Sequence, residues 1–166
     1  MRSNVAATTV DGMHDLVIRG GFVVDGTGRP GRIADVVVDD GLVTAVIDAD
    51  SVDDTGEAER VVDATGKLVT PGWVDIHTHY DGQASWDPYL TPSSWHGVTT
   101  VVMGNCGVGF APAAPDRHEW LIELMEGVED IPGTALTEGL TWDWESFEDY
   151  LDALDKRQFV IDIGAQ

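Results

Sequence analysis

Two histidines separated by one residue are the part of this sequence best suited by residue type and spacing to bind a ligand or take part in a reaction. His77 and His79 stand at the end of a strand-like segment, residues 73–77, which a Pro-Gly pair precedes. Side chains alternate along a strand, so the two imidazoles share one face if the strand continues to His79. Imidazoles held in this way can bind one metal ion, and neutral imidazole suits Zn²⁺. The alternative is a pair of solvent-exposed loop histidines, but the strand-end position favours metal ligands.

The single cysteine follows a second strand-like segment. Cys106 lies in the glycine-rich stretch 104–109, directly after the β-branched run 98–103. If the two strands are parallel neighbours, Cys106 lies at the same sheet edge as the histidines, and a thiolate beside two imidazoles would be a strong Zn²⁺ ligand. The alternative is a small buried hydrophobic residue. A phosphate-binding loop is not indicated, because the glycine spacing does not fit and no lysine follows.

Several neighbours of these three residues are candidates for supporting roles. Asp75 shares the face of the histidines, and we expect it to orient them from outside the ligand set rather than to act as a base. Tyr80 and Asp81 directly follow the histidine pair, and Asn105 precedes the cysteine, so all three are candidates to line a pocket. No catalytic acid or base is identifiable in the sequence. The remaining histidines are expected outside the site: His14 as an exposed residue, His96 as a structural one and His118 on a solvated helix face.

The pattern of predicted secondary structure in the chain that positions these residues changes at Pro71-Gly72. Residues 14–70 are dense in short β-branched segments, with Asp39-Asp-Gly41 as a tight hairpin turn, which predicts a small β-sandwich or half of one. After residue 71, strands alternate with helices, as in a parallel α/β barrel or open sheet. Strands are predicted over 73–77, 98–103 and 159–163, and helices over 116–128, capped by Asp116 with Glu119, and from Ser146, with Asp149 as its capping partner.

Length limits what this pattern can form. The chain has 166 residues, and the part after residue 70 holds about three βα units at roughly 30 residues each. A closed barrel needs roughly 250 residues. We therefore expect the N-terminal piece of a longer protein, with the first three or so barrel strands in residues 71–166. The alternative is a small domain built on an open three-stranded sheet.

Composition excludes some classes of partner. Nine Lys and Arg against 30 Asp and Glu give a formal net charge of −21, which argues against binding to nucleic acid or to anionic membranes. A single cysteine excludes an internal disulfide framework. Residues 1–13 lack the apolar core of a signal peptide and are predicted to be a flexible leader, so we expect a soluble, cytoplasmic protein.

The sequence resembles the amidohydrolase superfamily of metal-dependent hydrolases. The β-rich start followed by Pro71-Gly-Trp-Val-Asp-Ile-His-Thr-His79 carries this likeness, and Gly97-Val-Thr-Thr-Val-Val-Met-Gly-Asn-Cys-Gly107 narrows it to the D-aminoacylase group. The resemblance implies a β-sandwich beside a (β/α)8 barrel and assigns His77, His79 and Cys106 to the zinc site. In this group the cysteine takes the role that other branches give to a carboxylated lysine. The family's further ligands and substrate-binding residues come from later strands.

The function implied by this resemblance is hydrolysis of a linear amide in an N-acyl-D-amino acid. Zn²⁺ would polarise the carbonyl and activate water, and a carboxylate from later in the protein would transfer the proton. On this view the chain alone is inactive, and its partners are the small-molecule substrate and the rest of the barrel or another copy of the chain. The alternatives are a dihydropyrimidinase-like cyclic amidase and a non-catalytic metal-binding or assembly fragment.

Overall fold

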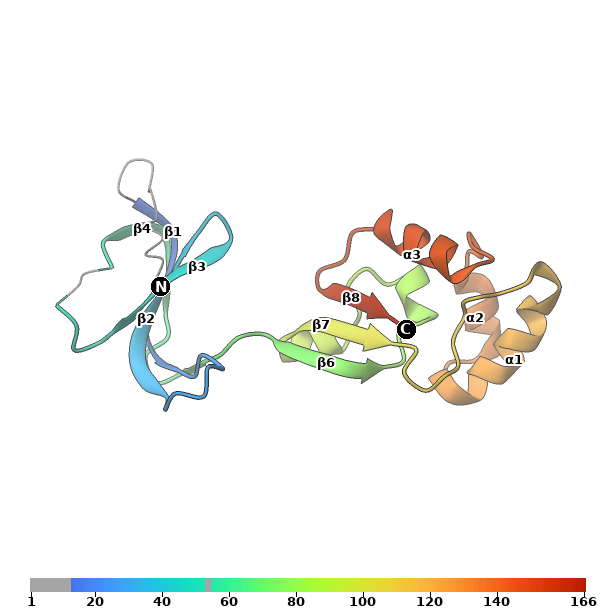
Figure 1. Ribbon diagram of the computed structural model, residues 1–166, viewed down its shortest axis with the longest axis horizontal. Helices are drawn as coiled ribbons and strands as arrows, with labels where there is room; N and C mark the ends of the chain where they lie inside the picture. Colours follow the sequence, from blue (N-terminus) through green and yellow to red (C-terminus); the bar gives the residue numbers. More distant parts are fainter. Residues whose placement is uncertain (1–12, 53–54) are drawn as a thin grey trace, which may run out of the picture. The chain divides into compact units, whose positions relative to one another are not determined.

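The computed structural model describes residues 13–52 and 55–166, and the chain divides into two compact units at Pro71 and Gly72. Each unit contains its own sheet (Figure 1). The leader predicted over residues 1–13 lies outside the described residues except for Met13, which begins the first strand, so the prediction is wrong at that residue. No helix within the described ranges is long and apolar enough to cross a membrane.

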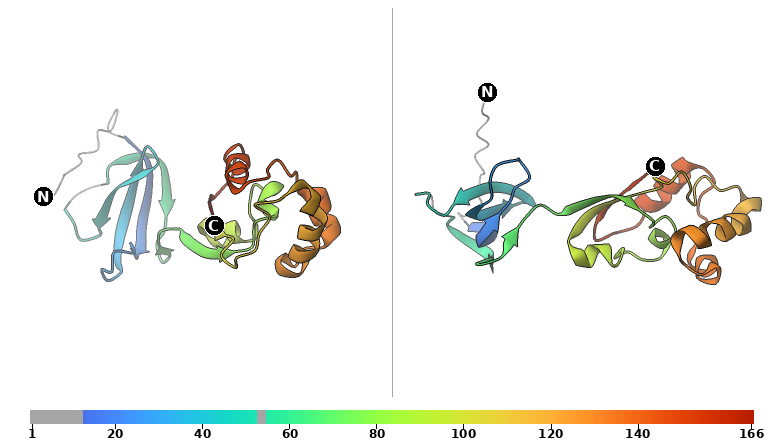
Figure 2. Two further views of the ribbon diagram at one scale, coloured as in Figure 1. Left: turned by 45° about the vertical axis from the view of Figure 1, so that its right-hand side comes forward. Right: turned by 90° about the horizontal axis from the view of Figure 1, so that it is seen from below.

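One five-stranded sheet forms the first unit. Its strands are β1 (Met13–Val23), β2 (Arg32–Asp39), β3 (Leu42–Asp48), β4 (Glu57–Asp63) and β5 (Leu68–Val69). β1, β2 and β3 pair antiparallel in succession, whereas β4 and β5 both run parallel to β1 (Figure 2). The predicted turn between β2 and β3 is confirmed, since Asp40 and Gly41 adopt φ values of 51° and 74°. The described residues of this unit contain no second sheet facing the first, so they do not complete a sandwich.

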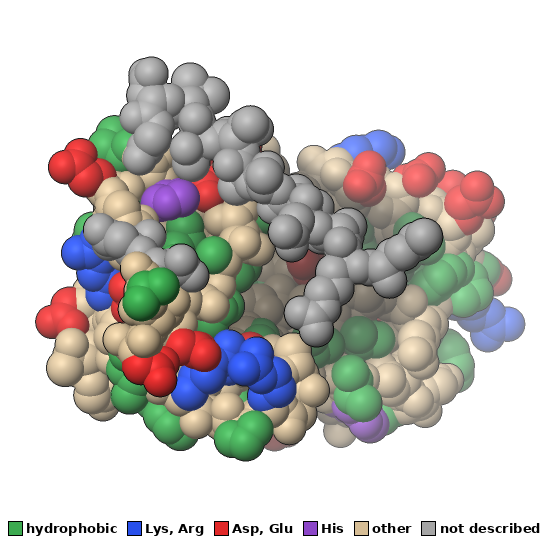
Figure 3. Space-filling view, turned by 60° about the vertical axis from the view of Figure 1, so that its left-hand side comes forward, with side chains coloured by type: hydrophobic (Ala, Val, Ile, Leu, Met, Phe, Trp, Pro, Cys, Tyr) green, Lys and Arg blue, Asp and Glu red, His purple; other side chains and the backbone are tan. Residues whose placement is uncertain are grey.

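Charged side chains of both signs are interspersed over the face shown in Figure 3. In the first unit, Arg32 pairs with Asp25 and Asp48, the nearer contact being the one to Asp48. Hydrogen bonds from the Thr27 side chain and backbone, together with Arg32, lower the pKa of Asp25 to about 2. His14, which the sequence places as exposed, is partly buried against Asp39, with its Nδ1 2.9 Å from a carboxylate oxygen.

Three parallel strands form the sheet of the second unit. They are β6 (Trp73–Thr78), β7 (Val98–Met103) and β8 (Asp162–Ala165), in the spatial order β6-β7-β8. Figure 1 shows the three arrows pointing the same way, so the loops after β6 and β7 leave from one edge of the sheet. The parallel arrangement confirms the alternation predicted after Pro71. β8 begins later than the predicted 159–163, because the backbone N–H of Val160 bonds to the carbonyl of Pro88 instead of to the sheet.

Helical segments connect these strands. They are the 3₁₀ turns η1 (Gln83–Ser85), η2 (Ser93–His96) and η3 (Pro115–Arg117) and the helices α1 (His118–Glu129), α2 (Gly133–Gly139) and α3 (Phe147–Asp155). The capping box predicted for α3 is confirmed, because Ser146 and Asp149 bond reciprocally. The cap predicted from Asp116 and Glu119 is wrong: α1 is entered through η3, and no side chain caps it. Helix α2 was not predicted from the sequence.

The helices cover the sheet with apolar side chains. Val101 and Met103 of β7 are fully buried, and Met125 of α1 and Leu136 of α2 belong to the same core. Trp144 joins this core, and its indole N–H donates a 2.7 Å hydrogen bond to the carbonyl of Phe110. Three further aromatic side chains of this unit lie outside the core and are exposed: Trp86, Tyr89 and Trp95. The same core includes Tyr80 and Phe110, so it joins β7 and α1 to the loops after β6 and β7.

Candidate metal centre

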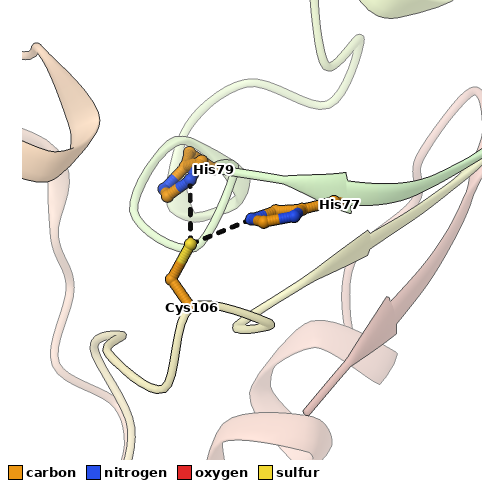
Figure 4. A group of neighbouring side chains, drawn as sticks. All are labelled: His77, His79 and Cys106. Atoms are coloured by element: carbon orange, nitrogen blue, oxygen red, sulfur yellow. Dashed lines mark hydrogen bonds between the residues drawn. The ribbon is translucent and has the colours of Figure 1, made fainter.

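His77, His79 and Cys106 meet at the carboxyl edge of β6 and β7. His77 is the next-to-last residue of β6, His79 follows the strand by one residue, and Cys106 lies three residues beyond the end of β7. The Cys106 sulfur is 2.9 Å from Nε2 of His77 and 3.5 Å from Nε2 of His79. Figure 4 shows the sulfur facing both imidazoles, with the loop after β7 brought against the end of β6. All three possible ligand atoms lie within 4.8 Å of one another.

Hydrogen bonds from side chains to backbone carbonyls hold the two ligand-bearing segments together. The Asn105 side chain donates a 2.7 Å hydrogen bond to the carbonyl of Ile76, next to His77. The Thr78 hydroxyl donates a 3.0 Å bond to the carbonyl of Val102 on the neighbouring strand. Directly after β7 the chain turns at Gly104, whose φ of 84° is costly for any residue with a Cβ. Asn105 was predicted to line a pocket. It is exposed instead, and its side chain connects the cysteine loop to β6.

The other predicted supporting residues take separate positions. Asp75 accepts a 3.2 Å hydrogen bond from the backbone N–H of His77, so its carboxylate contacts the main chain of the histidine segment rather than an imidazole. Tyr80 is buried, and its hydroxyl donates to the Ser93 hydroxyl. Asp81 is also buried and lines a cavity of about 190 Å³ together with Gly109 and Tyr150.

The histidines predicted to lie outside the site do so. His96 is exposed. His118 stacks on Trp142 with ring centroids 3.9 Å apart and planes 4° from parallel, so it packs against an aromatic ring instead of projecting into solvent as predicted.

Two buried carboxyl groups, those of Glu129 and Asp81, interact electrostatically with the candidate site around His79. The Glu129 side chain has no exposed surface, and its Oε1 is 3.9 Å from Nδ1 of His79. Burial raises the pKa of Glu129 to about 8, and the negative charge of nearby Asp81 adds to the rise. Burial likewise raises the pKa of Asp81 to about 6, against opposing contributions from its own backbone N–H and from His79. The edge of the site away from Cys106 is thus acidic and desolvated.

Glu129 was not predicted from the sequence as a residue of the site, although the sequence contains a signal for it. The apolar stripe of α1 includes Leu121 and Met125, which are both buried. Glu129 comes four residues after Met125, and residues four apart lie on the same helix face. A carboxylate that continues a buried apolar stripe is unusual, because an unpaired buried charge is costly. That position identifies it as a residue that needs explanation.

Comparison with known proteins places this geometry in a family. The model of the family described as "Amidohydrolase family" matches residues 60–166, which include all three converging side chains. The chain belongs to the amidohydrolase family. Among curated amidohydrolase relatives, the D-aminoacylase of Alcaligenes xylosoxydans xylosoxydans is 37% identical over 140 residues, covering 84% of this chain and 26% of the relative. An N-acyl-D-glutamate deacylase from the same organism is 36% identical over 155 residues, covering 91% and 28%.

Solved structures show the same likeness. A D-aminoacylase studied for its binuclear metal centre matches this amidohydrolase chain with a TM-score of 0.70 and 36% identity, covering 92% of this chain and 29% of the solved one. The N-acyl-D-glutamate deacylase of Bordetella bronchiseptica, solved with zinc and a phosphonate inhibitor, matches with a TM-score of 0.63 and 32% identity over the same shares. The chain thus spans between a quarter and three tenths of the length of these relatives.

Proposed function

We propose that this chain supplies part of the metal site of a zinc-dependent hydrolase that cleaves the linear amide of N-acyl-D-amino acids. The observation that carries the proposal is the position of the Cys106 sulfur against Nε2 of both His77 and His79. The 36–37% identity to enzymes that deacylate D-amino acids supports the same substrate class. A cysteine in this place also favours the D-aminoacylase group over cyclic amidases, because the sequence resemblance implies that cyclic amidases use a lysine as the corresponding metal ligand.

The three side chains fit a zinc ion in type and spacing. Thiolate and imidazole are preferred zinc donors, with bond lengths of about 2.3 and 2.0–2.1 Å. Tetrahedral bonds of those lengths separate the donor atoms by about 3.3–3.6 Å. The 3.5 Å separation of the sulfur from Nε2 of His79 lies in this range, the 2.9 Å separation from Nε2 of His77 is shorter, and all three atoms lie within 4.8 Å of one another.

The chemistry divides between the ion and the protein. When bound, Zn²⁺ supplies Lewis acidity toward the amide carbonyl and lowers the pKa of water. The side chain of Cys106 contributes a negative charge that offsets the ion's positive charge, and the two imidazoles contribute neutral nitrogen. Asn105 and Thr78 keep the donors in mutual position through their bonds to Ile76 and Val102. We assign no general base within this chain, so proton transfer requires a group from elsewhere in the protein.

The architecture follows from the same proposal. We assign residues 14–70 to part of a β-sandwich domain and residues 71–166 to the first strands of a (β/α)8 barrel. The sequential order β6-β7-β8, all parallel, supports the barrel assignment, since adjacent barrel strands follow one another along the chain. The active site of such barrels lies at the carboxyl ends of the strands, where the three donors meet. Completion of the barrel, by further chain or by a second copy, is part of the proposal.

Titration of the metal-stripped chain with Co²⁺ tests the proposal. A thiolate ligand gives cobalt a charge-transfer absorption in the near ultraviolet, and we expect this band in the wild type. Cys106→Ser should abolish it, and His77→Ala or His79→Ala should weaken binding by at least tenfold. His96→Ala is the matched control, because His96 is exposed and lies outside the site. A wild-type chain that binds neither Co²⁺ nor Zn²⁺, or binding that Cys106→Ser leaves intact, would overturn the assignment.

A further inference from the structure

A buried acidic side chain of the second unit lies against one of the proposed ligands. Glu129 is the last residue of α1, and its side chain is fully buried. Within the described residues, neither of its carboxylate oxygens has a hydrogen-bond partner. Buried polar groups in native proteins are nearly always paired, so two unpaired oxygens on one side chain call for an explanation.

The two nitrogens of His79 face different groups. Nε2 is 3.5 Å from the Cys106 sulfur, whereas Nδ1 is 3.9 Å from Oε1 of Glu129. The imidazole therefore stands between a thiol on one side and a buried carboxylate on the other. The Nδ1–Oε1 distance is about 1 Å longer than an N–H···O hydrogen bond. The His79 side chain is 38% exposed and so has room to turn toward Glu129.

We propose that Glu129 is a positioning residue that holds the Nδ1 proton of His79 and thereby leaves Nε2 unprotonated, with its lone pair available to the metal on the side that faces Cys106. A neutral imidazole carries one proton, and the group facing one nitrogen decides which tautomer is present. A ligating histidine normally donates its other ring N–H to a carboxyl group, a backbone carbonyl or water, and loss of such a partner commonly reduces metal affinity 10–100-fold. This inference rests on the proposed zinc site and extends it to a residue outside the ligand set.

The packing of α1 suits such a role. Leu121 and Met125 fasten the same helix face into the core, so Glu129 is held on a rigid element rather than on a loop. The charge of Asp81, in the segment after His79, further disfavours the ionised form of Glu129. A methionine at position 129 would fill the space without burying two unpaired polar oxygens. The acid therefore weakens the fold of the metal-free chain, a cost that a function at His79 would explain.

Two substitutions separate positioning from packing. Glu129→Met removes both oxygens but keeps the length of the side chain, whereas Glu129→Gln keeps one carbonyl acceptor. We expect Glu129→Met to bind Zn²⁺ 10–100-fold more weakly than the wild type while remaining equally or more resistant to urea. Glu129→Gln should lose less affinity, since its carbonyl still accepts a hydrogen bond from Nδ1. Glu123→Met, an exposed position on the same helix, is the control and should leave affinity unchanged.

A second experiment measures the tautomer of His79 in the metal-free chain, independently of zinc binding. Nitrogen-15 shifts of the imidazole distinguish a proton on Nδ1 from one on Nε2, and we expect the Nδ1–H form in the wild type and a shift toward Nε2–H in Glu129→Met. Unchanged tautomer populations, or a loss of urea resistance in proportion to the loss of affinity, would overturn the inference. If the wild type binds no Zn²⁺, the proposed function fails, while the tautomer measurement still decides the role of Glu129.

Discussion

The phenolic hydroxyl of Tyr150 donates a 2.8 Å hydrogen bond to the backbone carbonyl of Asp81. The bond joins α3 to the segment just after His79, although the two residues are 69 positions apart. Both residues are buried, so the carbonyl has no access to solvent as a substitute partner. The contact therefore fixes the path of the chain where it leaves the candidate site.

Tyr150→Phe should destabilise the second unit because it leaves the Asp81 carbonyl buried and unpaired. We expect a loss of about 1–3 kcal/mol in the free energy of unfolding, the usual cost of such a group. Urea denaturation followed by tryptophan fluorescence measures it. Tyr89→Phe, at a residue that is 57% exposed, should change stability by less than about 0.5 kcal/mol. Equal effects of the two substitutions would contradict the role given to the Tyr150 hydroxyl.

Asn105→Ala should weaken metal binding without removing a ligand. Its amide is the group that ties the cysteine loop to the carbonyl of Ile76, so the loop loses a restraint next to Cys106. We expect the affinity for Zn²⁺ to fall by about tenfold or more. Asn105→Asp is the matched variant, because it keeps the size of the side chain but cannot donate. Full affinity in either variant would show that the bond does not hold the cysteine in place.

Ser146→Ala should remove the capping box of α3. The Ser146 hydroxyl accepts from the N–H of Asp149 at 3.1 Å, and the Asp149 carboxylate accepts from the N–H of Ser146 at 3.0 Å. Loss of such a cap costs about 1 kcal/mol of stability, and Ser146→Thr should retain most of it. Thermal unfolding of the three proteins by circular dichroism provides the comparison. An unchanged melting temperature in the alanine variant would contradict the assignment.

Asp25 should titrate with a pKa of about 2 in the folded chain. Because the folded value lies below the ordinary 3.8, ionised Asp25 stabilises the first unit above pH 3.8, and this contribution disappears as the pH falls through about 2. Thr27→Val removes the largest cause, the hydroxyl hydrogen bond, and should raise the Asp25 pKa toward 3.8. Carboxyl carbon NMR follows the titration, with Asp63 as an internal reference. A wild-type value at or above 3.8 would refute the bonding described around Asp25.

Local patterns predicted the elements that carry the candidate ligands. The β-branched run of β7, the Pro-Gly break before β6 and the Asp-Gly turn between β2 and β3 each depend on nearby residues only, and each was found where it was expected. The reciprocal bonds of Ser146 and Asp149 are local in the same sense. The meeting of His77 with Cys106 also follows from pattern, since parallel neighbours share a carboxyl edge.

Long-range packing explains what the sequence did not predict. The burial of Glu129 depends on how α1 lies over the strand ends, which no short window of sequence contains. The parallel pairing of β4 with β1 joins segments more than 40 residues apart, with β2 and β3 between them in the sequence. The predicted cap at Asp116 was wrong because a 3₁₀ turn leads into α1, so its first residues take a different backbone path.

The short stretch of chain between the candidate ligands has a consequence for folding. Cys106 lies 29 residues from His77 and 27 from His79, and one parallel strand pair closes this loop. The entropy lost on closing a loop rises only with the logarithm of its length, so a loop of this size closes at modest cost. The three donors can therefore meet as soon as β6 and β7 pair, before β8 joins the sheet. A metal ion captured at that stage would act as a folding nucleus and stabilise the first strand pair while the rest of the unit forms around it.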